Sequence, residues 1–214
     1  MKLPKYLLLS CLLALTGMTT DASAEPRLNK DYHLITPAQP TETGNKIEVI
    51  EFFYYGCSHC FDLEPYLERW KSSLPKDVAF RLLPAVFRDS WVPLTRTFYT
   101  LEALDELARL HNAVFEAIHL KSINLNNEQT LLDWVEKNGV DRKKFADAYE
   151  SFAVRNRTAN ARKLTLAYGV EATPSLVVDG KYLTGSGLTS SHESAMKVLD
   201  ELIAKAREER ASKH

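Results

Sequence analysis

The apolar pattern of the chain first predicts a buried strand that leads directly into a helix. Residues 46–55, KIEVIEFFYY, are rich in β-branched and aromatic side chains and lie between Gly44 and Gly56. This composition is typical of a central strand that is buried on both faces. From Ser58 the apolar positions recur at helical spacing until Pro75, which ends the predicted helix.

Residues 77–87 predict a second strand after this helix. A strand, a helix and a strand in this order form the unit that pairs two strands in parallel. Residues 25–45 contain three prolines and a glycine. They predict an irregular or edge-strand arm that leads into the unit.

The apolar period is helical over most of residues 90–168. One amphipathic helix is expected from Leu101 to Ile118, a second around residues 131–135, and a third that begins within residues 145–152. Their apolar stripes are most simply explained as core. This long helical stretch separates the strands before it from those after it.

Strands return near the end of the chain. Residues 175–178 and 181–184 flank Asp179-Gly180, a strong signal for a hairpin turn. Residues 191–210 predict a closing helix with Ser191 as its N-terminal cap. The chain is therefore expected to mix strands and helices in one α/β fold.

Residues 1–24 predict a cleaved secretory signal. Lysines near the start precede an apolar stretch over residues 7–15, and Ala22-Ser23-Ala24 gives the small-x-small pattern before Glu25. The apolar stretch is shorter than the roughly 20 residues that a membrane-spanning helix needs. We therefore expect an exported protein rather than a membrane-anchored one.

Composition and charge exclude several classes of function. The 214 residues are 45% hydrophobic and 26% charged, with a formal net charge of −1. This balance excludes a collagenous or disordered chain and predicts a globular one. Without a field of one sign, the protein has no electrostatic means to gather nucleic acid or anionic lipid. Function must come from a local site.

Two cysteines remain once residues 1–24 are removed, Cys57 and Cys60. In the chain-entropy model a disulfide across so short a loop stabilises by only about 2 kcal/mol, so a purely structural role is a weak explanation. The pair lies where the predicted strand ends and the helix begins. Unpaired N–H groups at a helix start stabilise a thiolate, so we expect Cys57 to be the nucleophile and Cys60, one turn further, the shielded resolving thiol.

His59 lies between the two cysteines and is a second candidate for tuning the site. A protonated or hydrogen-bonding imidazole would stabilise the Cys57 thiolate further. A stabilised thiolate favours only the reduced form, so the disulfide becomes a stronger oxidant. Each pKa unit is worth about 1.4 kcal/mol, which is about 30 mV for a two-electron couple.

Metal and haem sites fit these residues poorly. A c-type haem site needs His directly after the second Cys, and position 61 is Phe. A structural zinc site normally has a second Cys or His pair, and the remaining histidines show no ligand spacing. We therefore expect neither a c-type haem nor a metal at these residues. These histidines are His33, His111, His119, His192 and His214, of which His111 and His119 are expected at the surface or core edge of helices.

Glu51 and Thr173-Pro174 are further candidates for the same site. An ionised, unpaired acid in the middle of an apolar strand costs several kcal/mol, so Glu51 is either paired or has a raised pKa. It is a candidate to relay a proton to or from Cys60, unless its side chain reaches the surface. Thr173-Pro174 precedes a strand; it is either an ordinary turn or a cis bond that presents the Thr173 backbone to an extended peptide.

The segments EFFYYGCSHCFDLEP (51–65) and TPSLVVDGKY (173–182) resemble the DsbA family of periplasmic thiol:disulfide oxidases. The resemblance covers the whole chain after residue 24. It implies a thioredoxin fold with an inserted helical domain. Residues 25–88 and 166–214 would form the thioredoxin-like part, and residues 89–165 the insertion.

The resemblance also implies the roles of the site. Cys57 would attack, Cys60 would resolve, His59 would tune the thiolate, Glu51 would be the buried acid, and Thr173 would precede a cis Pro174. The protein would be a periplasmic monomer without a cofactor. It would give its disulfide to exported proteins with free cysteines and be reoxidised by a DsbB-type inner-membrane quinone reductase.

One residue departs from the family pattern, and two other functions remain open. Family members commonly carry proline where this chain has Ser58, which adds an N–H and a hydroxyl near the thiolate but loses rigidity at the helix start. The first alternative is a disulfide isomerase or reductase of the same fold. The second is a peptide-binding chaperone whose Cys57–Cys60 disulfide is redox-inert.

Overall fold

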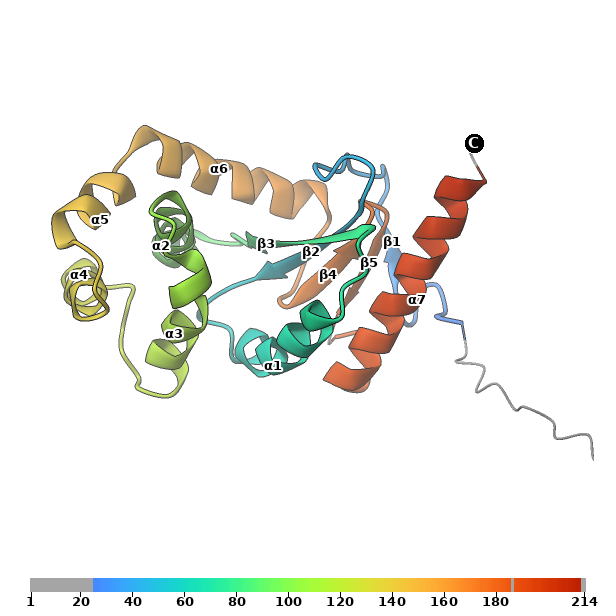
Figure 1. Cartoon of the computed structure of the whole chain (residues 1–214), viewed down its shortest axis with the longest axis horizontal. Coiled ribbons are helices and arrows are strands. Elements are labelled where there is room, and N and C mark those ends of the chain that lie inside the picture. Colours follow the sequence, from blue (N-terminus) through green and yellow to red (C-terminus); the bar gives the residue numbers. More distant parts are fainter. Residues whose placement is uncertain (1–24, 186, 213–214) are drawn as a thin grey trace, which may run out of the picture.

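A computed structural model describes residues 25–185 and 187–212 (Figure 1). The predicted signal, residues 1–24, lies outside the described residues. Five strands form one sheet in the order β1-β5-β4-β2-β3. Only β2 and β3 pair in parallel, which confirms the predicted strand, helix and strand unit. The strands are β1 (His33–Leu34), β2 (Ile47–Phe53), β3 (Val78–Pro84), β4 (Ser175–Val178) and β5 (Tyr182–Gly185).

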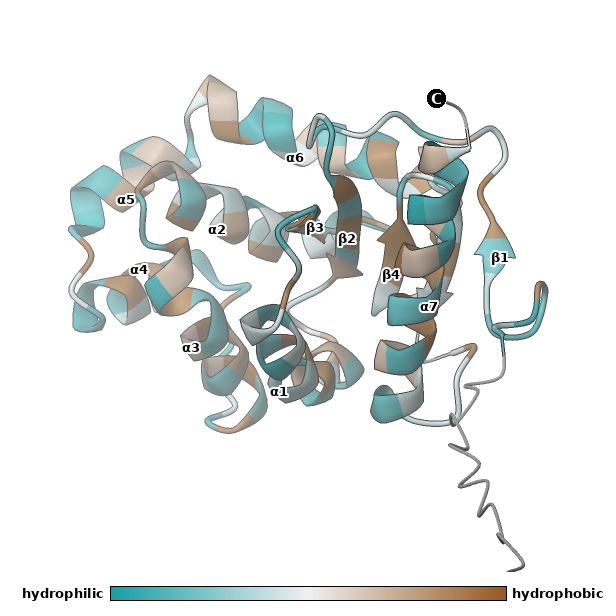
Figure 2. Ribbon diagram, turned by 45° about the vertical axis from the view of Figure 1, so that its right-hand side comes forward, coloured by the Kyte–Doolittle hydropathy of each residue, from teal (hydrophilic) through white to brown (hydrophobic). Residues whose placement is uncertain are grey.

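Helices α1 (Ser58–Ser72) and α7 (His192–Ala211) cover one face of the sheet. Strands β2 and β4, which lie beneath them, are strongly hydrophobic (Figure 2). The predicted cap of the last helix is confirmed, because the Ser194 backbone N–H donates to the Ser191 hydroxyl at 3.1 Å. The buried cluster on this face includes Ile47 and Val49 of β2, Leu63 and Leu67 of α1, and Leu199 and Leu202 of α7.

The predicted hairpin turn joins β4 to β5. Asp179 has φ 55° and Gly180 has φ 65°, the left-handed backbone that this turn requires. A side chain at Gly180 would meet the backbone oxygen of Gln39, while the Gln39 N–H donates to the Gly180 carbonyl at 2.9 Å. The turn thus holds the N-terminal arm against the sheet, and only glycine fits there.

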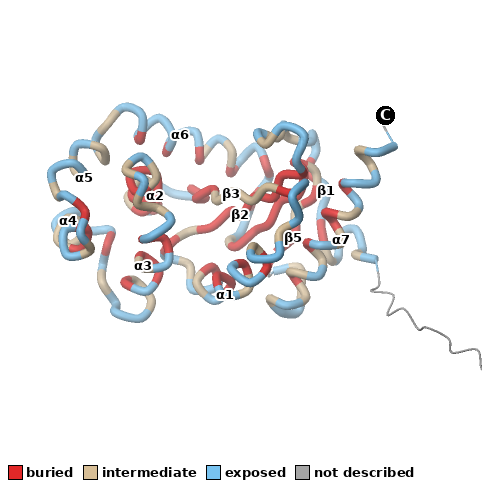
Figure 3. The backbone as a smooth tube through the Cα atoms, viewed as in Figure 1, coloured by how far each residue is buried: buried red, intermediate tan, exposed pale blue. Residues whose placement is uncertain are grey.

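A helical region connects β3 to β4 and packs against the other side of the sheet (Figure 1). Its buried residues form one cluster with Ile50 and Phe52 of β2. The sheet interior is buried, whereas the outward faces of the helices are exposed (Figure 3). The helices are α2 (Val92–Ala103), α3 (Leu107–His119), α4 (Glu128–Lys137), α5 (Arg142–Tyr149) and α6 (Phe152–Ala167), after a short 3-10 helix at Asp89–Trp91.

Two predicted helices in this region are wrong in the same way. The expected helix from Leu101 to Ile118 is interrupted, because Asp105 adopts φ 59° and the Glu106 N–H bonds back to the Leu101 carbonyl at 2.8 Å. This left-handed residue ends α2 and lets α3 start in a new direction. The expected helix from residues 145–152 is likewise divided at Ser151, whose side chain caps α6.

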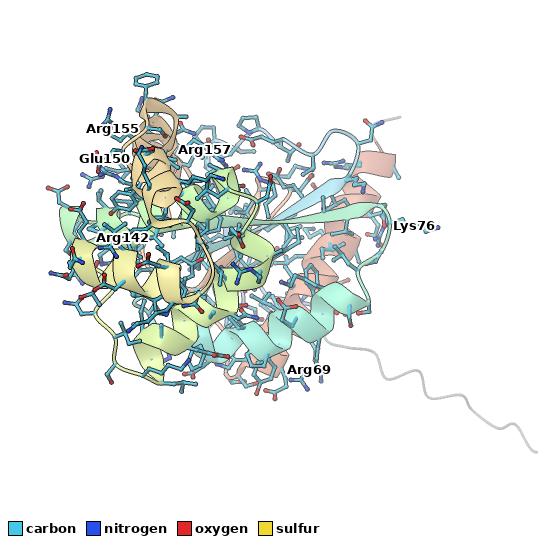
Figure 4. The ribbon with its side chains drawn as sticks, turned by 60° about the vertical axis from the view of Figure 1, so that its left-hand side comes forward. Arg69, Lys76, Arg142, Glu150, Arg155 and Arg157 are labelled. Atoms are coloured by element: carbon cyan, nitrogen blue, oxygen red, sulfur yellow. The ribbon has the colours of Figure 1, made fainter. Side chains whose placement is uncertain are left out.

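The outer end of the helical region is charged and exposed (Figure 4). Glu150 accepts from Arg155 at 3.2 Å and from Arg96 at 2.9 Å, and Arg142 pairs with Asp133 at 2.6 Å. Exposed pairs of this kind stabilise little. Among the described helices, none combines the length and apolar character needed to cross a bilayer.

Candidate active site

The chain turn between β2 and α1 places Cys57 at the very start of the helix. Cys57 is the N-cap residue with an extended backbone, φ −94° and ψ 116°. Its N–H donates to the Tyr54 carbonyl at 2.9 Å, and its carbonyl accepts the first helical bond, from Phe61, at 3.2 Å. The Tyr54 ring stacks on Trp91 at 3.8 Å between centroids, which fixes the turn from the side. The Cys57 sulfur therefore faces the unpaired N–H groups of the first helical turn.

The surroundings of Cys57 favour its thiolate. The pKa of Cys57 is lowered from an ordinary value of 9 to about 5. The largest cause of this shift is a hydrogen bond from the Cys60 thiol. Partial burial opposes this shift, while the Thr173 side chain and the backbone N–H groups of Cys60 and His59 add to it. The predicted direction for this thiol therefore agrees with the geometry.

Cys60 lies in the opposite environment, although it is only one helical turn away. Its side chain is completely buried. Burial raises the pKa of Cys60 above its ordinary value, and the hydrogen bond to Cys57 and the nearby Glu51 raise it further. Cys60 is therefore the protonated, shielded member of the pair. Both cysteines are free thiols, so this is the reduced form.

The pairing of β2 with β4 brings Thr173-Pro174 to the cysteines. Phe52, near the end of β2, pairs with Ser175, the first residue of β4. The preceding Thr173-Pro174 bond is cis. The Cys57 thiol donates to the Thr173 carbonyl oxygen at 3.3 Å. This backbone oxygen therefore lies directly beside the attacking sulfur.

Glu51 points from β2 toward α1. Side chains alternate along a strand, so Glu51 shares the face of Val49, which packs under α1 and α7. The carboxyl group is completely buried, and neither of its oxygens has a hydrogen-bond partner among the described residues. Burial raises the pKa of Glu51 well above its ordinary value, and the charge of Glu64 raises it further. The alternative in which this side chain reaches the surface is excluded.

His59 stands apart from these residues. It lies in the first turn of α1, and its side chain is exposed. His59 lowers the pKa of Cys57 through its backbone N–H group. Tuning by its imidazole stays a prediction.

Three buried polar residues near the site were not singled out from the sequence: Tyr55, Glu64 and His111. The Glu64 carboxylate lies 3.3 Å from His111 Nε2, and the Tyr55 hydroxyl lies 2.9 Å from His111 Nδ1. His111 is buried, so the expected surface position is wrong, whereas the expected core-edge position fits. Its spacing from Val114 and Phe115, three and four residues on, was the signal that it shares their buried face.

His119 makes a second contact between α3 and the active-site turn. Its Nε2 lies 2.8 Å from the Tyr55 carbonyl oxygen, and its ring stacks on Phe61 with centroids 5.2 Å apart. The expectation of a core-edge position fits this half-buried residue. Two histidines of one helix therefore hold the residue that lies two positions before Cys57.

The arrangement is suited to dithiol chemistry. One sulfur is charged and accessible at neutral pH, and the other is protonated and shielded. Within residues 25–185 and 187–212, no group of three or more His, Cys, Asp and Glu side chains is placed to hold a metal ion. A Cys-x-x-Cys pair at a strand-to-helix turn, beside a cis-proline segment of the same sheet, defines the class of thioredoxin-fold thiol–disulfide oxidoreductases.

Comparison with known proteins gives the family within this class. Residues 88–197 match the family model described as the DSBA-like thioredoxin domain. The thiol:disulfide interchange protein DsbA of Burkholderia cepacia is 37% identical over 210 residues, which cover 98% of this chain and 99% of that protein. The Pseudomonas aeruginosa PAO1 protein of the same name is 38% identical over 206 residues, which cover 95% of this chain and 97% of that protein.

The structure agrees with these sequence relationships. The crystal structure of Pseudomonas aeruginosa DsbA matches with a TM-score of 0.82 at 39% identity, covering 88% of this chain and 97% of that chain. The chain belongs to the DsbA family of thiol:disulfide oxidoreductases. The predicted thioredoxin fold with an inserted helical domain is confirmed.

Proposed function

We propose that the protein donates its Cys57–Cys60 disulfide to exported proteins as they fold in the periplasm. The main support for this proposal is that the pKa values of the two thiols are shifted in opposite directions. The pKa of Cys57 is lowered to about 5, and the pKa of Cys60 is raised above its ordinary value. A reduced form with a stabilised thiolate is the favoured product when the disulfide is given away.

The reaction has two exchange steps. A substrate thiolate attacks the Cys57 sulfur, the Cys57–Cys60 bond breaks, and Cys60 leaves with the electron pair and takes up a proton. A second substrate thiolate then attacks the substrate sulfur of the mixed disulfide, and Cys57 leaves as a stable thiolate. The substrate is oxidised to a disulfide, and the protein is reduced to the dithiol.

The pKa of Cys57 sets the driving force. A pKa of about 5 lies two units below neutral pH, which corresponds to at most about 2.7 kcal/mol of stabilisation of the reduced form. Cys57 is partly exposed, and solvent screening reduces this value. We expect the potential to rise by roughly 40 mV relative to a pair with an unshifted thiol.

The other site residues have supporting roles in this proposal. Glu51 supplies the proton that Cys60 needs, because it is buried, its raised pKa favours the protonated form, and its charge affects both thiols. The Thr173 carbonyl, held before Pro174 and beside Cys57, pairs with the backbone of an extended substrate segment. His59 adds to the stabilisation of the thiolate.

Family membership supports the proposed partners and compartment. Substrates are exported proteins with free cysteines, and a DsbB-type inner-membrane quinone reductase restores the disulfide. A pKa of Cys57 near 5 favours the oxidase over a reductase, because reductases keep their disulfide stable instead. A redox-inert chaperone would not need one strongly acidified thiol.

A redox titration and a thiolate titration test the proposal together. The protein is equilibrated with reduced and oxidised glutathione, and its dithiol fraction is measured after acid quenching and alkylation. The Cys57 thiolate is followed in parallel by ultraviolet absorbance across pH 3 to 9. We expect an oxidising equilibrium and a thiolate that persists to about pH 5. A disulfide more stable than that of glutathione would overturn the donor role.

A further inference from the structure

The buried acid of the site has no direct exchange with solvent. Glu51 is completely buried, and both its oxygens lack a hydrogen-bond partner among the described residues. In the proposed function, on which this inference rests, Cys60 gains a proton each time the disulfide opens and loses it each time the disulfide forms. Glu51 must therefore recover or release a proton in every cycle.

Glu64 is a buried carboxyl group whose charge acts on Glu51. It lies four residues after Cys60 on α1, so both side chains are on the same face of the helix. Glu64 is only 5% exposed, and after burial its charge is the largest influence on Glu51. Two buried groups that interact electrostatically titrate as a pair, so a proton gained or lost by Glu64 changes the proton affinity of Glu51.

His111 continues the polar contacts from Glu64 to the edge of the core. Its Nε2 lies 3.3 Å from Glu64 Oε1, and its Nδ1 lies 2.9 Å from the Tyr55 hydroxyl. The rings of Phe53 and Phe115 hold the imidazole, with centroids 5.2 and 5.3 Å away. The shorter contact fixes the ring, and the longer one is at the weak end of the hydrogen-bond range.

A cavity open to the surface reaches His111 from the other side. It has a volume of about 510 Å³ and lies between α1, the end of α2 and the start of α3. Imidazole both accepts and releases protons near neutral pH, as no other side chain does without a shifted pKa. The polar residues around the opening are Glu68 and Lys71 of α1, Glu102 at the end of α2, Asp105 of the turn, and Asn112 of α3.

We propose that His111 is the proton port of the redox site, connecting the buried Glu64–Glu51 pair to solvent in this cavity. When the disulfide opens, the electron pair goes to the Cys60 sulfur and a proton moves to it from Glu51. Glu51 recovers a proton from Glu64, and Glu64 recovers one from His111, which takes one from solvent. The direction reverses when Cys60 is oxidised again. His111 touches no substrate atom and is a positioning and proton-exchange residue.

A structural role is the competing explanation for His111. The imidazole joins α3 to α1 through Glu64 and to the active-site turn through Tyr55, so its loss also weakens these contacts. The two explanations differ in what an external proton carrier does. A proton port can be replaced by a small diffusible base that enters the cavity, whereas a lost structural contact cannot.

The experiment measures how fast the protein catalyses oxidation of a dithiol peptide by excess oxidised glutathione over many turnovers, because Glu51 must recover its proton between cycles; acid quenching, alkylation and mass determination follow the peptide. We expect His111→Ala to be about tenfold slower at pH 7, a modest fraction of what proton transfer contributes to catalysis. Free imidazole should restore the rate in a concentration-dependent manner, because the truncated side chain extends the cavity toward Glu64. Imidazole should not accelerate the wild-type protein.

Two further variants make the result decisive. His119→Ala removes the neighbouring α3 histidine, which contacts Tyr55 but not Glu64, and imidazole should not accelerate it. His111→Gln keeps hydrogen-bonding groups but cannot titrate, so it should be slow at unchanged thermal stability; this variant decides the matter if His111→Ala does not fold.

Distinct results separate this inference from the proposed function. Wild-type rates in both His111 variants, or a slow His111→Ala that imidazole does not restore, would overturn the proton port. Equal acceleration of His119→Ala by imidazole would do the same. Failure of the wild-type protein to oxidise the peptide at all would instead remove the proposed donor role.

Discussion

The first turn of α1 separates two regions with opposite chemistry. The exposed side of the site, or mouth, contains Cys57, the Thr173 carbonyl and free N–H groups. Hydrogen bonds from the Cys60 thiol, the Thr173 side chain and backbone N–H groups hold the pKa of Cys57 at about 5. The buried side of the site, which we call the chamber, contains the buried residues Cys60, Glu51 and Glu64. Here burial raises the pKa values of Cys60 and Glu51.

The difference shows that position on the helix matters more than residue type. Both groups are cysteine thiols in the same turn, and they hydrogen-bond to each other. Cys57 is close to donors that stabilise charge, whereas Cys60 is surrounded by apolar atoms and carboxyl groups that oppose it. A disulfide between two such sulfurs breaks asymmetrically, because Cys57 is the stable thiolate and Cys60 is the group that must be protonated.

Removing the sulfur of the mouth should have the largest effect. We expect Cys57→Ser to abolish disulfide transfer to a reduced peptide, since no attackable disulfide remains. Cys60→Ser is the matched control in the chamber. It keeps the Cys57 thiolate and should accumulate mixed disulfides with substrate proteins, which non-reducing electrophoresis detects. Transfer at a normal rate by Cys57→Ser would contradict the assignment.

The pH dependence of stability should show the difference between the mouth and the chamber directly. The folded pKa of Cys57, about 5, is below the ordinary 9, so its contribution to the reduced form is complete above pH 9 and is lost as pH falls through 5. Discounted for partial exposure, we expect a change of about 3 kcal/mol in stability. Urea unfolding of the dithiol form between pH 4 and 9 measures it.

The oxidised protein is the control for this measurement. It has no Cys57 thiol, but it keeps Glu51, whose raised pKa gives stability below the ordinary carboxyl range that is lost as pH rises through the folded value. The difference between reduced and oxidised forms therefore isolates Cys57. A difference that does not change with pH would contradict the acidified thiol.

Replacing the acid of the chamber should slow the reaction without removing it. We expect Glu51→Gln to reduce the rate of disulfide transfer about a hundredfold at pH 7, at the lower end of what proton transfer contributes. The loss reflects a Cys60 thiolate that must leave without a proton. Single-turnover reduction of the oxidised protein measures the rate.

Glu48→Gln offers a matched comparison on the same strand. Glu48 is also completely buried, but it lies on the opposite face of β2 and pairs with Arg81 at 2.9 Å. Its loss should lower stability by about 1 to 3 kcal/mol, because Arg81 loses one of its two carboxylate partners and keeps Glu42 at 2.7 Å, and should leave the transfer rate unchanged. Equal slowing by both variants would show that burial of charge, and not proton transfer, limits the rate.

The smallest effect among the variants is expected at Thr173, beside Cys57. Thr173→Val removes a hydroxyl that helps lower the pKa of Cys57, and we expect that pKa to rise by about half a unit, within the range of one weak hydrogen bond. Thiolate absorbance measures the change. Thr189→Val, which removes a hydroxyl from the loop after β5, should leave the titration curve of Cys57 unchanged.

Much of the fold could be predicted because its signals are local. Residues 46–55 had the composition of a buried strand, Asp179-Gly180 had turn chemistry, and Ser191 had a cap signal; all three are where they were expected. The break at Asp105 was missed because the apolar period continues across it. A single left-handed residue redirects the chain there without disturbing the hydrophobic pattern.

The site residues likewise divide into those that the sequence could predict and those that it could not. The positions of Cys57, Cys60 and Glu51 follow from one strand and one helix, so the sequence was enough to find them. The contact between Thr173 and Cys57 depends on how β4 pairs with β2. His111 was missed because its partners come from α1 and from the turn after β2, and sequence spacing does not record such contacts between segments.

The two histidines of α3 connect the helical region to the residues next to the redox-active cysteines. His111 is within hydrogen-bond distance of the Tyr55 hydroxyl. His119 is within hydrogen-bond distance of the Tyr55 carbonyl oxygen, and its ring stacks on Phe61. Only Gly56 separates Tyr55 from Cys57, so these contacts from α3 also fix the position of the backbone that carries the reactive sulfur.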